Sequence, residues 1–146
     1  MREILFRGKR CDNGEWVHGF YVRADHHWHK NGQHKDWIIC GASANGGWFA
    51  LHNKYPVTHD TVSQFTGLTD KNGKKVFEND IIVICYETDG EEFSETKKVH
   101  YNEKKCCWYP MRWEECCEHC DHYTEVKSIE VIGNIHDNPE LLEAQR

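Results

Sequence analysis

The chain has 146 residues, enough for one ordinary domain or for two small barrels that share a core surface. A mean hydropathy of -0.81 and 29% charged residues argue against a membrane span, because no stretch approaches the roughly 20 apolar residues that a bilayer requires. Residues 1–7 become polar too soon for a signal peptide, so we expect a cytoplasmic protein. The net charge of -6 argues against a protein that coats nucleic acid, since such binding neutralises phosphates with Lys and Arg.

Strand patterns flank an Asn-Gly turn near the start of the chain. Ile4–Phe6 and Trp16–Val22 are apolar, and Asn13-Gly14 favours the positive φ values of a tight hairpin turn. The polar and His-rich residues 24–36 are expected to form a loop or hairpin tip. Short apolar runs at residues 37–40 and 48–51 predict a second hairpin.

The segment Gln64–Val83 is the most informative part of the sequence. Its turn, Asp70-Lys71-Asn72-Gly73, contains residues that tolerate the left-handed conformation. The run Ile81–Tyr86 that follows is apolar on both faces, which a strand tolerates only when both sides are covered. We therefore expect either a small closed barrel or a subunit contact around this strand.

The two Asn-Gly turns share a pattern at a spacing of 59 positions. The identities are Phe6, Gly8, Asn13, Gly14 and Val17, which recur as Phe65, Gly67, Asn72, Gly73 and Val76. Gly and Asn are common in turns, so duplication of one hairpin and convergence on the same turn chemistry are both open explanations.

The C-terminal half begins with a run of acidic residues. Residues 87–95 are expected to form an acidic loop, and residues 97–101 and 106–113 have the pattern of a strand pair. Residues 125–135 predict a last strand. Asn138 and Pro139 predict the start of a short helix, because Asn caps helices and Pro suits the first helical position.

Three ordered blocks of the sequence carry a resemblance to a known family. They are Arg2–Lys9 followed by Gly14–Gly19, then Val62–Ile82, and finally Val131–Leu142. Together they resemble the YopX family, whose members are small proteins encoded by bacteriophages and prophages. Asn79 stands where the family commonly has Gly before Asp-Ile-Val; both residues accept positive φ, so the turn is expected to survive.

The resemblance implies a mostly-β architecture of small β-barrel type. It places an SH3-like barrel in the C-terminal part, followed by the short helix. We therefore divide the chain into an N-terminal β subdomain, residues 1–60, and a C-terminal SH3-like barrel subdomain, residues 61–146, packed together as one unit. The family has no established activity or catalytic residues, so none can be transferred to this chain.

Five cysteines lie close together in the stretch from residue 106 to residue 120. Cys117 and Cys120 have the C-x2-C spacing that allows two thiolates to reach one tetrahedral zinc ion. Cys106 or Cys107, together with His122, could complete the four ligands, and Cys107 is the one we assign. The alternative is a set of reduced cysteines on a variable hairpin, because the second ligand pair forms no matching motif.

Two groups of cations define a candidate nucleic-acid surface. They are Arg7, Lys9 and Arg10 near the first turn, and Lys71, Lys74 and Lys75 near the second. The two groups would lie together if the two related hairpins packed side by side. The alternative for each group is an ordinary solvated surface.

Signals for catalysis are missing from the sequence. None of the serines lies in a nucleophile elbow, and no Gly-rich phosphate loop precedes a helix. The pair His59-Asp60 is adjacent, and neighbours on a strand point to opposite faces. We therefore expect no enzyme and no cofactor apart from the candidate zinc ion.

The function we predict is that of a phage-type accessory protein that acts by binding to a protein partner or to itself. We expect it in the bacterial cytoplasm, without a membrane partner. The alternatives are a nucleic-acid-associated module and a zinc-binding structural or sensor protein.

Overall fold

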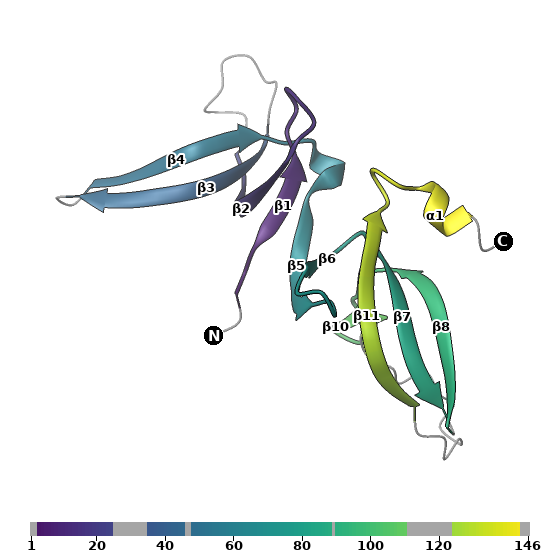
Figure 1. The fold of residues 1–146 in the computed structure, drawn as a ribbon. Helices are drawn as coiled ribbons and strands as arrows, with labels where there is room; N and C mark the ends of the chain where they lie inside the picture. The colour runs from purple at the N-terminus through teal and green to yellow at the C-terminus, as the bar shows by residue number, and fades with distance from the viewer. Residues whose placement is uncertain (1–2, 25–34, 46–47, 89, 111–123, 144–146) are drawn as a thin grey trace. The chain divides into compact units, whose positions relative to one another are not determined.

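The structure is a computed structural model that describes residues 3–24, 35–45, 48–88, 90–110 and 124–143 (Figure 1). Strands account for most of these residues, and one short helix lies near the C-terminus, which confirms the predicted mostly-β class. The elements are β1 (Phe6–Lys9), β2 (Trp16–Arg23), β3 (Asp36–Asn45), β4 (Trp48–Pro56), the 3-10 turn η2 (His59–Thr61), β5 (Ser63–Thr69), β6 (Lys75–Phe77), β7 (Asp80–Thr88), β8 (Glu91–Lys98), β9 (His100–Asn102), β10 (Cys107–Tyr109), β11 (Thr124–Asn134) and α1 (Glu140–Glu143). Within the described ranges, no helix has the length and apolar content that crossing a membrane requires.

The chain divides into two compact units, Met1–Phe65 and Thr66–Arg146. The division lies inside β5, whereas the boundary predicted from the sequence lies between residues 60 and 61. That the two parts pack as one unit stays a prediction. The hydrogen-bonded strand orders are β4-β3-β2-β1-β5-β6, β11-β7-β8 and β10-β9.

The first unit is built on an antiparallel sheet with β1 near its centre. Phe6 lies opposite Gly19 of β2 on one side and opposite Gln64 of β5 on the other. Gly19 allows a close approach of strands, since a Cβ atom there would lie 2.2 Å from the carbonyl oxygen of Ile39. The buried apolar side chains of this unit are Ile38, Ile39, Val57 and Phe65.

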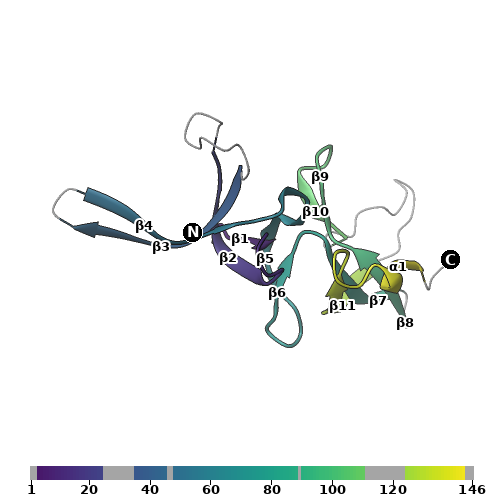
Figure 2. The same ribbon diagram turned by 90° about the horizontal axis from the view of Figure 1, so that it is seen from above.

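The hairpin of β3 and β4 extends beyond the rest of its sheet. Only the start of β3, residues 36–39, pairs with β2, whereas pairing with β4 continues to Asn45 and Trp48. Figure 2 shows the remainder as a two-stranded projection. The hairpin predicted from the apolar runs at residues 37–40 and 48–51 is therefore confirmed, and both of its strands are longer than predicted.

The second unit has β7 as its central strand, between β11 and β8. The buried side chains of Val76, Ile82, Ile84, Val99 and Val131 form its core. Trp108 from β10, together with Val126 and Ile129 from β11, packs against this core. The last strand predicted at residues 125–135 is β11, which runs from Thr124 to Asn134, and the predicted short helix is α1.

The turn Glu78-Asn79-Asp80 connects β6 to β7 and confirms the prediction for Asn79. Asn79 has φ 65°, and its N–H donates to the carbonyl oxygen of Val99 at 2.9 Å. The buried carboxylate of Asp80 accepts a hydrogen bond from the Phe77 N–H at 2.7 Å. Asn79 therefore adopts the left-handed conformation that this turn requires.

The predicted barrel is not what the described residues form. Their sheets are open, and the SH3-like barrel is not confirmed. The inference from Ile81–Tyr86 assumed that both faces of the strand need a cover. Ile82 and Ile84 are fully buried on the core face, but on the other face only Ile81 is fully buried, while Val83 and Cys85 are half-buried. A barrel is therefore not required to cover this strand.

The predicted acidic loop at residues 87–95 is wrong. Residues 80–88 form β7 and residues 91–98 form β8, and the two strands are paired along their whole length. The predicted strand at residues 97–101 is instead divided between the end of β8 and the start of β9. The charged composition of β8 is unusual for a strand, so the sequence did not indicate one. The first half of β8 is exposed to solvent, and its pairing with β7 holds it in place.

Candidate binding surface

Strand β8 forms one edge of the three-stranded sheet, and no other described strand pairs with its outer side. Its pairing with β7 runs without interruption from Ile81–Lys98 to Thr88–Glu91, with no register shift. Bulges, Pro, charged side chains and covering elements are the usual devices that keep sheet edges from pairing with other chains. The β8 edge contains no bulge and no Pro, but it carries five charged side chains, so a further strand that pairs with it must complement these charges.

The hydrogen bond from the Val99 N–H to the carbonyl oxygen of Asp80, 2.8 Å long, sets the pattern of the ladder. In an antiparallel pair, hydrogen-bonded and non-hydrogen-bonded residue pairs alternate, so Lys97 and Ile82 exchange hydrogen bonds. Every second residue of β8 then directs its backbone groups away from β7. These residues are Glu92, Ser94, Thr96 and Lys98.

An exposed aromatic pair lies beside this edge. The Phe93 side chain is 44% exposed, and its ring stacks on that of Tyr86 with a centroid separation of 5.7 Å and an interplanar angle of 22°. Burial raises the pKa of Tyr86, and the charge of Glu95 raises it further. Aromatic side chains are enriched in protein interfaces, so Phe93 offers a partner strand apolar contact area.

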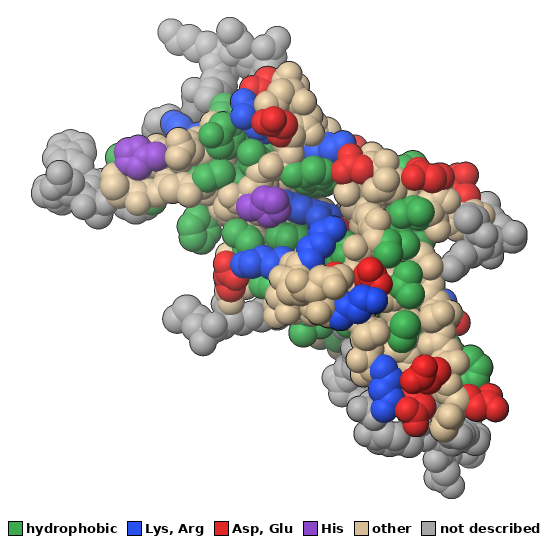
Figure 3. All heavy atoms as spheres, in the orientation of Figure 1, with side chains coloured by type: hydrophobic (Ala, Val, Ile, Leu, Met, Phe, Trp, Pro, Cys, Tyr) green, Lys and Arg blue, Asp and Glu red, His purple; other side chains and the backbone are tan. Residues whose placement is uncertain are grey.

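The charges of β8 are divided along its length. Glu91 and Glu92 occupy the exposed first half, and Lys97 and Lys98 the second. Lys97 Nζ lies 3.0 Å from the carboxylate of Glu95, and this hydrogen bond raises the pKa of Lys97. Figure 3 shows acidic and basic side chains side by side at the end of β7, β8 and β11 that is distant from α1. The first half of β8 is thus acidic and the second half basic.

The opposite edge of this sheet is covered by the second Asn-Gly turn. The Lys71 N–H donates to the Ile129 carbonyl oxygen at 2.9 Å, and the Asp70 carboxylate accepts from the Val131 N–H at 3.1 Å. The same carboxylate accepts from the N–H groups of Asn72 and Lys74. Burial alone would raise the pKa of Asp70, but these three N–H groups outweigh it and lower the pKa.

The outer edge of β4, in the first unit, is interrupted at one residue. Asn53 has φ 51° and takes no part in the residue pairing with β3, and the strand ends at Pro56. Both features disfavour pairing with a further strand. Of the long strands that end a described sheet, β8 alone has an uninterrupted register, and the short helix α1 contacts part of it.

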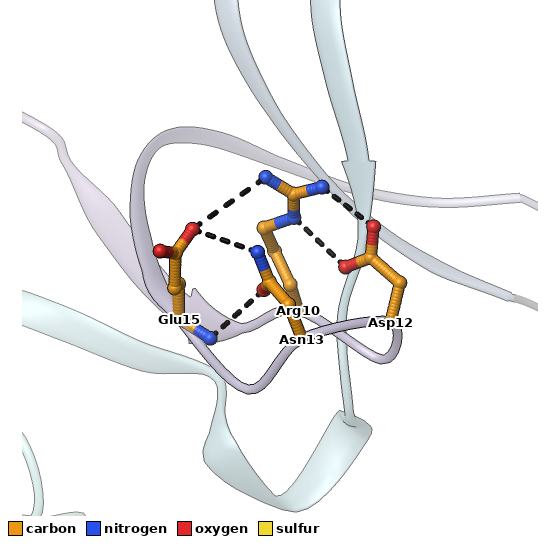
Figure 4. A network of polar contacts seen from close by, with 4 residues as sticks. All are labelled: Arg10, Asp12, Asn13 and Glu15. Atoms are coloured by element: carbon orange, nitrogen blue, oxygen red, sulfur yellow. Dashed lines mark hydrogen bonds and ion pairs between the residues drawn. The ribbon is translucent and has the colours of Figure 1, made fainter.

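The first Asn-Gly turn is stabilised by its own side chains (Figure 4). The Arg10 guanidinium donates to both carboxylate oxygens of Asp12 and lies 3.8 Å from the carboxylate of Glu15. Asn13 donates to the Glu15 carboxylate at 2.7 Å. Arg10 also stacks over the ring of Tyr55, 4.5 Å from its centroid. Its charge is therefore engaged within the first unit.

The predicted nucleic-acid residues fall into two different units. Arg7 is buried, 4.6 Å from the Trp16 ring centroid, and the Lys9 amine lies 5.6 Å from the same ring. In the second unit, Lys71 forms an ion pair with Glu130 at 2.5 Å, Lys74 is exposed and Lys75 is half-buried. A single surface that joins both groups stays a prediction.

A buried carboxylate in the first unit escaped the sequence analysis. Asp36 accepts hydrogen bonds from the Tyr21 hydroxyl at 2.5 Å and from His59 Nδ1 at 3.2 Å. Burial would raise the pKa of Asp36, but these two partners lower it, whereas burial and the bond to Asp36 raise the pKa of Tyr21 to about 12. The sequence analysis considered His59 only with its neighbour Asp60. The long-range partner has no sequence signal, and the cluster connects β2, β3 and η2.

The candidate zinc site is largely outside the described residues. Cys107 is a free, half-buried cysteine on β10, whereas Cys117, Cys120 and His122 lie outside the described ranges. Among the residues that the structure describes, no group of three or more His, Cys, Asp or Glu side chains could hold a metal. The zinc site therefore stays a prediction.

The described residues define a mostly-β protein with open sheets. The family model described as YopX protein matches residues 5–143, so the chain belongs to the YopX family. No curated protein matches it. The solved structure titled "Crystal structure of protein EF1440 from Enterococcus faecalis" is similar in fold, with a TM-score of 0.55 and 22% identity over 97% of this chain and 99% of that one.

Proposed function

We propose that this chain is a phage-derived accessory protein that acts in the bacterial cytoplasm by binding, through protein–protein contact or self-association. The uninterrupted outer edge of β8 carries the proposal. Addition of a strand to such an edge supplies backbone hydrogen bonds for affinity, and neighbouring side chains supply specificity. The proposed function involves no catalysis, and the expectation that the chain is not an enzyme stays a prediction.

The side chains beside the edge support this function. Phe93 offers exposed apolar area next to the backbone groups of Ser94, which point away from β7. A partner strand laid on the edge would reduce the exposure of Phe93 while it gains backbone hydrogen bonds. The same strand offers charges of both signs, so the order of charges on the partner selects its direction and register.

The nucleic-acid alternative has weaker support. The position of Lys9 at the Trp16 ring favours it, because cations beside aromatic rings are common where proteins bind single strands. Arg7 lies at the same ring but is buried. Against it, Arg10 is bound to Asp12 and Lys71 to Glu130. Each of these cations would have to leave a carboxylate before it could neutralise a phosphate.

A proline on the edge tests the proposed function. Ser94→Pro removes an N–H that points away from β7, so the strand itself should form, as prolines are tolerated on solvent-facing edges. Ser94→Ala is the matched control because it keeps the N–H. We expect wild type and Ser94→Ala to show the same self-association, and the same captured proteins from a host lysate, with both reduced in Ser94→Pro. Unchanged assembly and unchanged capture by a folded Ser94→Pro variant would contradict the proposal.

A further inference from the structure

We propose that the partner of the β8 edge is a second copy of this chain, and that two β8 strands pair antiparallel about a two-fold axis at Ser94. This inference rests on the proposed function and names its partner. The result would be one continuous six-stranded sheet in the order β11-β7-β8-β8-β7-β11. The backbone pattern, the charges and the exposed aromatic ring of β8 support this arrangement.

The backbone pattern limits the possible registers. Residues that point their backbone groups outward must lie opposite residues of the partner that do the same. Glu92, Ser94 and Thr96 belong to this outward set, so the residue numbers of each facing pair must be both even or both odd. A two-fold axis then passes through a single residue position of β8.

The charges select one register from this set. With Ser94 on the axis, Glu91 lies opposite the partner's Lys97, and Glu92 lies opposite the partner's Thr96. No two like charges are directly opposite. With the axis at residue 93, Glu91 would face the partner's Glu95, and with the axis at residue 95, Glu95 would face its own copy. An axis at Thr96 would leave much of the acidic half of the strand unpaired.

The same register places the exposed aromatic rings near each other. Phe93 would lie opposite the partner's Glu95 and diagonal to the partner's Phe93, at about 7–8 Å between backbones, within reach of aromatic side chains. Each Phe93 would keep its stack on Tyr86 of its own chain. The hydrogen-bonded pairs centred on Ser94 would supply about six backbone hydrogen bonds. The small Ser94 side chain fits at the axis, where two copies of one residue meet.

Charge reversal gives a direct test by light scattering or sedimentation on the full chain. Wild type should approach twice its 17.3 kDa mass at concentrations of about 0.5 mM. Glu91→Lys should place two lysines opposite each other at both ends of the interface, and Lys97→Glu two glutamates. We expect each variant to raise the dimer dissociation constant about tenfold or more, because like charges directly opposite are destabilising. Glu103→Lys, with the same charge change on an exposed turn, should leave the constant unchanged.

An equimolar mixture of Glu91→Lys and Lys97→Glu gives the decisive result. Each facing pair in the mixed dimer is again of opposite sign, so association should return to within about threefold of wild type. Recovery also shows that both variants are folded. A monomeric wild type at about 0.5 mM would overturn the inference, as would reversal variants that dimerise like wild type or a mixture that stays monomeric. The loss of lysate capture in Ser94→Pro would still support the proposed function in each of these cases.

Discussion

The two Asn-Gly turns share five identities at a spacing of 59 positions, yet the structure uses them differently. Gly14 has φ 72° and Gly73 has φ 81°, so both turns place Gly in the left-handed region. The first turn closes with Gly14 N–H donating to the Arg10 carbonyl oxygen, and the second with Gly73 N–H donating to that of Asp70. The spacing of 59 positions between the glycines therefore does not extend to their hydrogen-bond acceptors.

The surroundings of the two turns differ more than their backbones. The Asp12 side chain is 55% exposed and binds only within its own turn among the contacts described, whereas Asp70 is 7% exposed and binds β11. The first turn is a surface feature. The second covers the β11 edge of its sheet, which leaves β8 as the open edge. Similar turn chemistry thus has a local role in one unit and an architectural role in the other.

Replacement of Asp70 and of Asp12 by Ala should reveal the largest difference in stability between the two turns. Asp70→Ala leaves the N–H groups of Asn72, Lys74 and Val131 without their acceptor, so we expect a loss of about 2–4 kcal/mol in the free energy of unfolding. Asp12→Ala should change stability little, because exposed ion pairs contribute little. Urea denaturation measures both variants. Equal effects would show that the second turn does not anchor β11.

Substitution of the two glycines should give the same result in both turns. A Cβ at Gly14 or Gly73 would meet no atom within 4 Å, so only the positive φ is affected. We expect Gly14→Ala and Gly73→Ala each to cost about 1 kcal/mol. Thermal unfolding of both variants checks this. A much larger loss in one of them would mean that the backbones of the two turns are not equivalent.

Acid should weaken the second turn by a smaller amount. The pKa of Asp70 is lowered in the folded chain, so its contribution to stability is present above about pH 4 and is lost as the pH falls through the folded pKa. Asp70→Asn should therefore lose less stability between pH 5 and pH 2 than wild type does. Denaturation curves across this range measure the difference. Parallel pH profiles would show that the Asp70 carboxylate has no special role.

The smallest effect concerns nucleic acid. Lys74→Glu with Lys75→Glu reverses two cations of the second turn. We expect little binding of single-stranded DNA at low salt either before or after this change. Fluorescence anisotropy measures it. Salt-dependent binding that the double substitution abolishes would favour the nucleic-acid alternative over protein contact.

The sequence predicted what local chemistry controls. Both Asn-Gly turns, the hairpin of β3 and β4, the last strand and Asn79 at positive φ follow from neighbouring residues and from the family resemblance. The open edge was missed because the Glu-rich run was interpreted as a loop. The dipeptide Asp89-Gly90, a common hairpin turn, and the alternation around Phe93 were the available signals.

Long-range contacts could not be predicted in this way. Asp36 binds Tyr21 and His59, and Asp70 binds the Val131 N–H, across sequence separations that no local pattern records. The barrel was an expectation from the family and from the apolar run Ile81–Tyr86. In the structure, one face of β7 is only half-buried at Val83 and Cys85, so the apolar run does not require a closed barrel.

Hydrogen exchange at two protein concentrations tests the central claim, binding through the β8 edge, most directly. We predict that the amides of Glu92, Ser94 and Thr96 become protected as concentration rises, because they point away from β7. The amides of Phe93 and Glu95, already bonded to β7, should exchange slowly at both concentrations. Exchange at Glu92, Ser94 and Thr96 that stays fast at every concentration would contradict self-association through this edge.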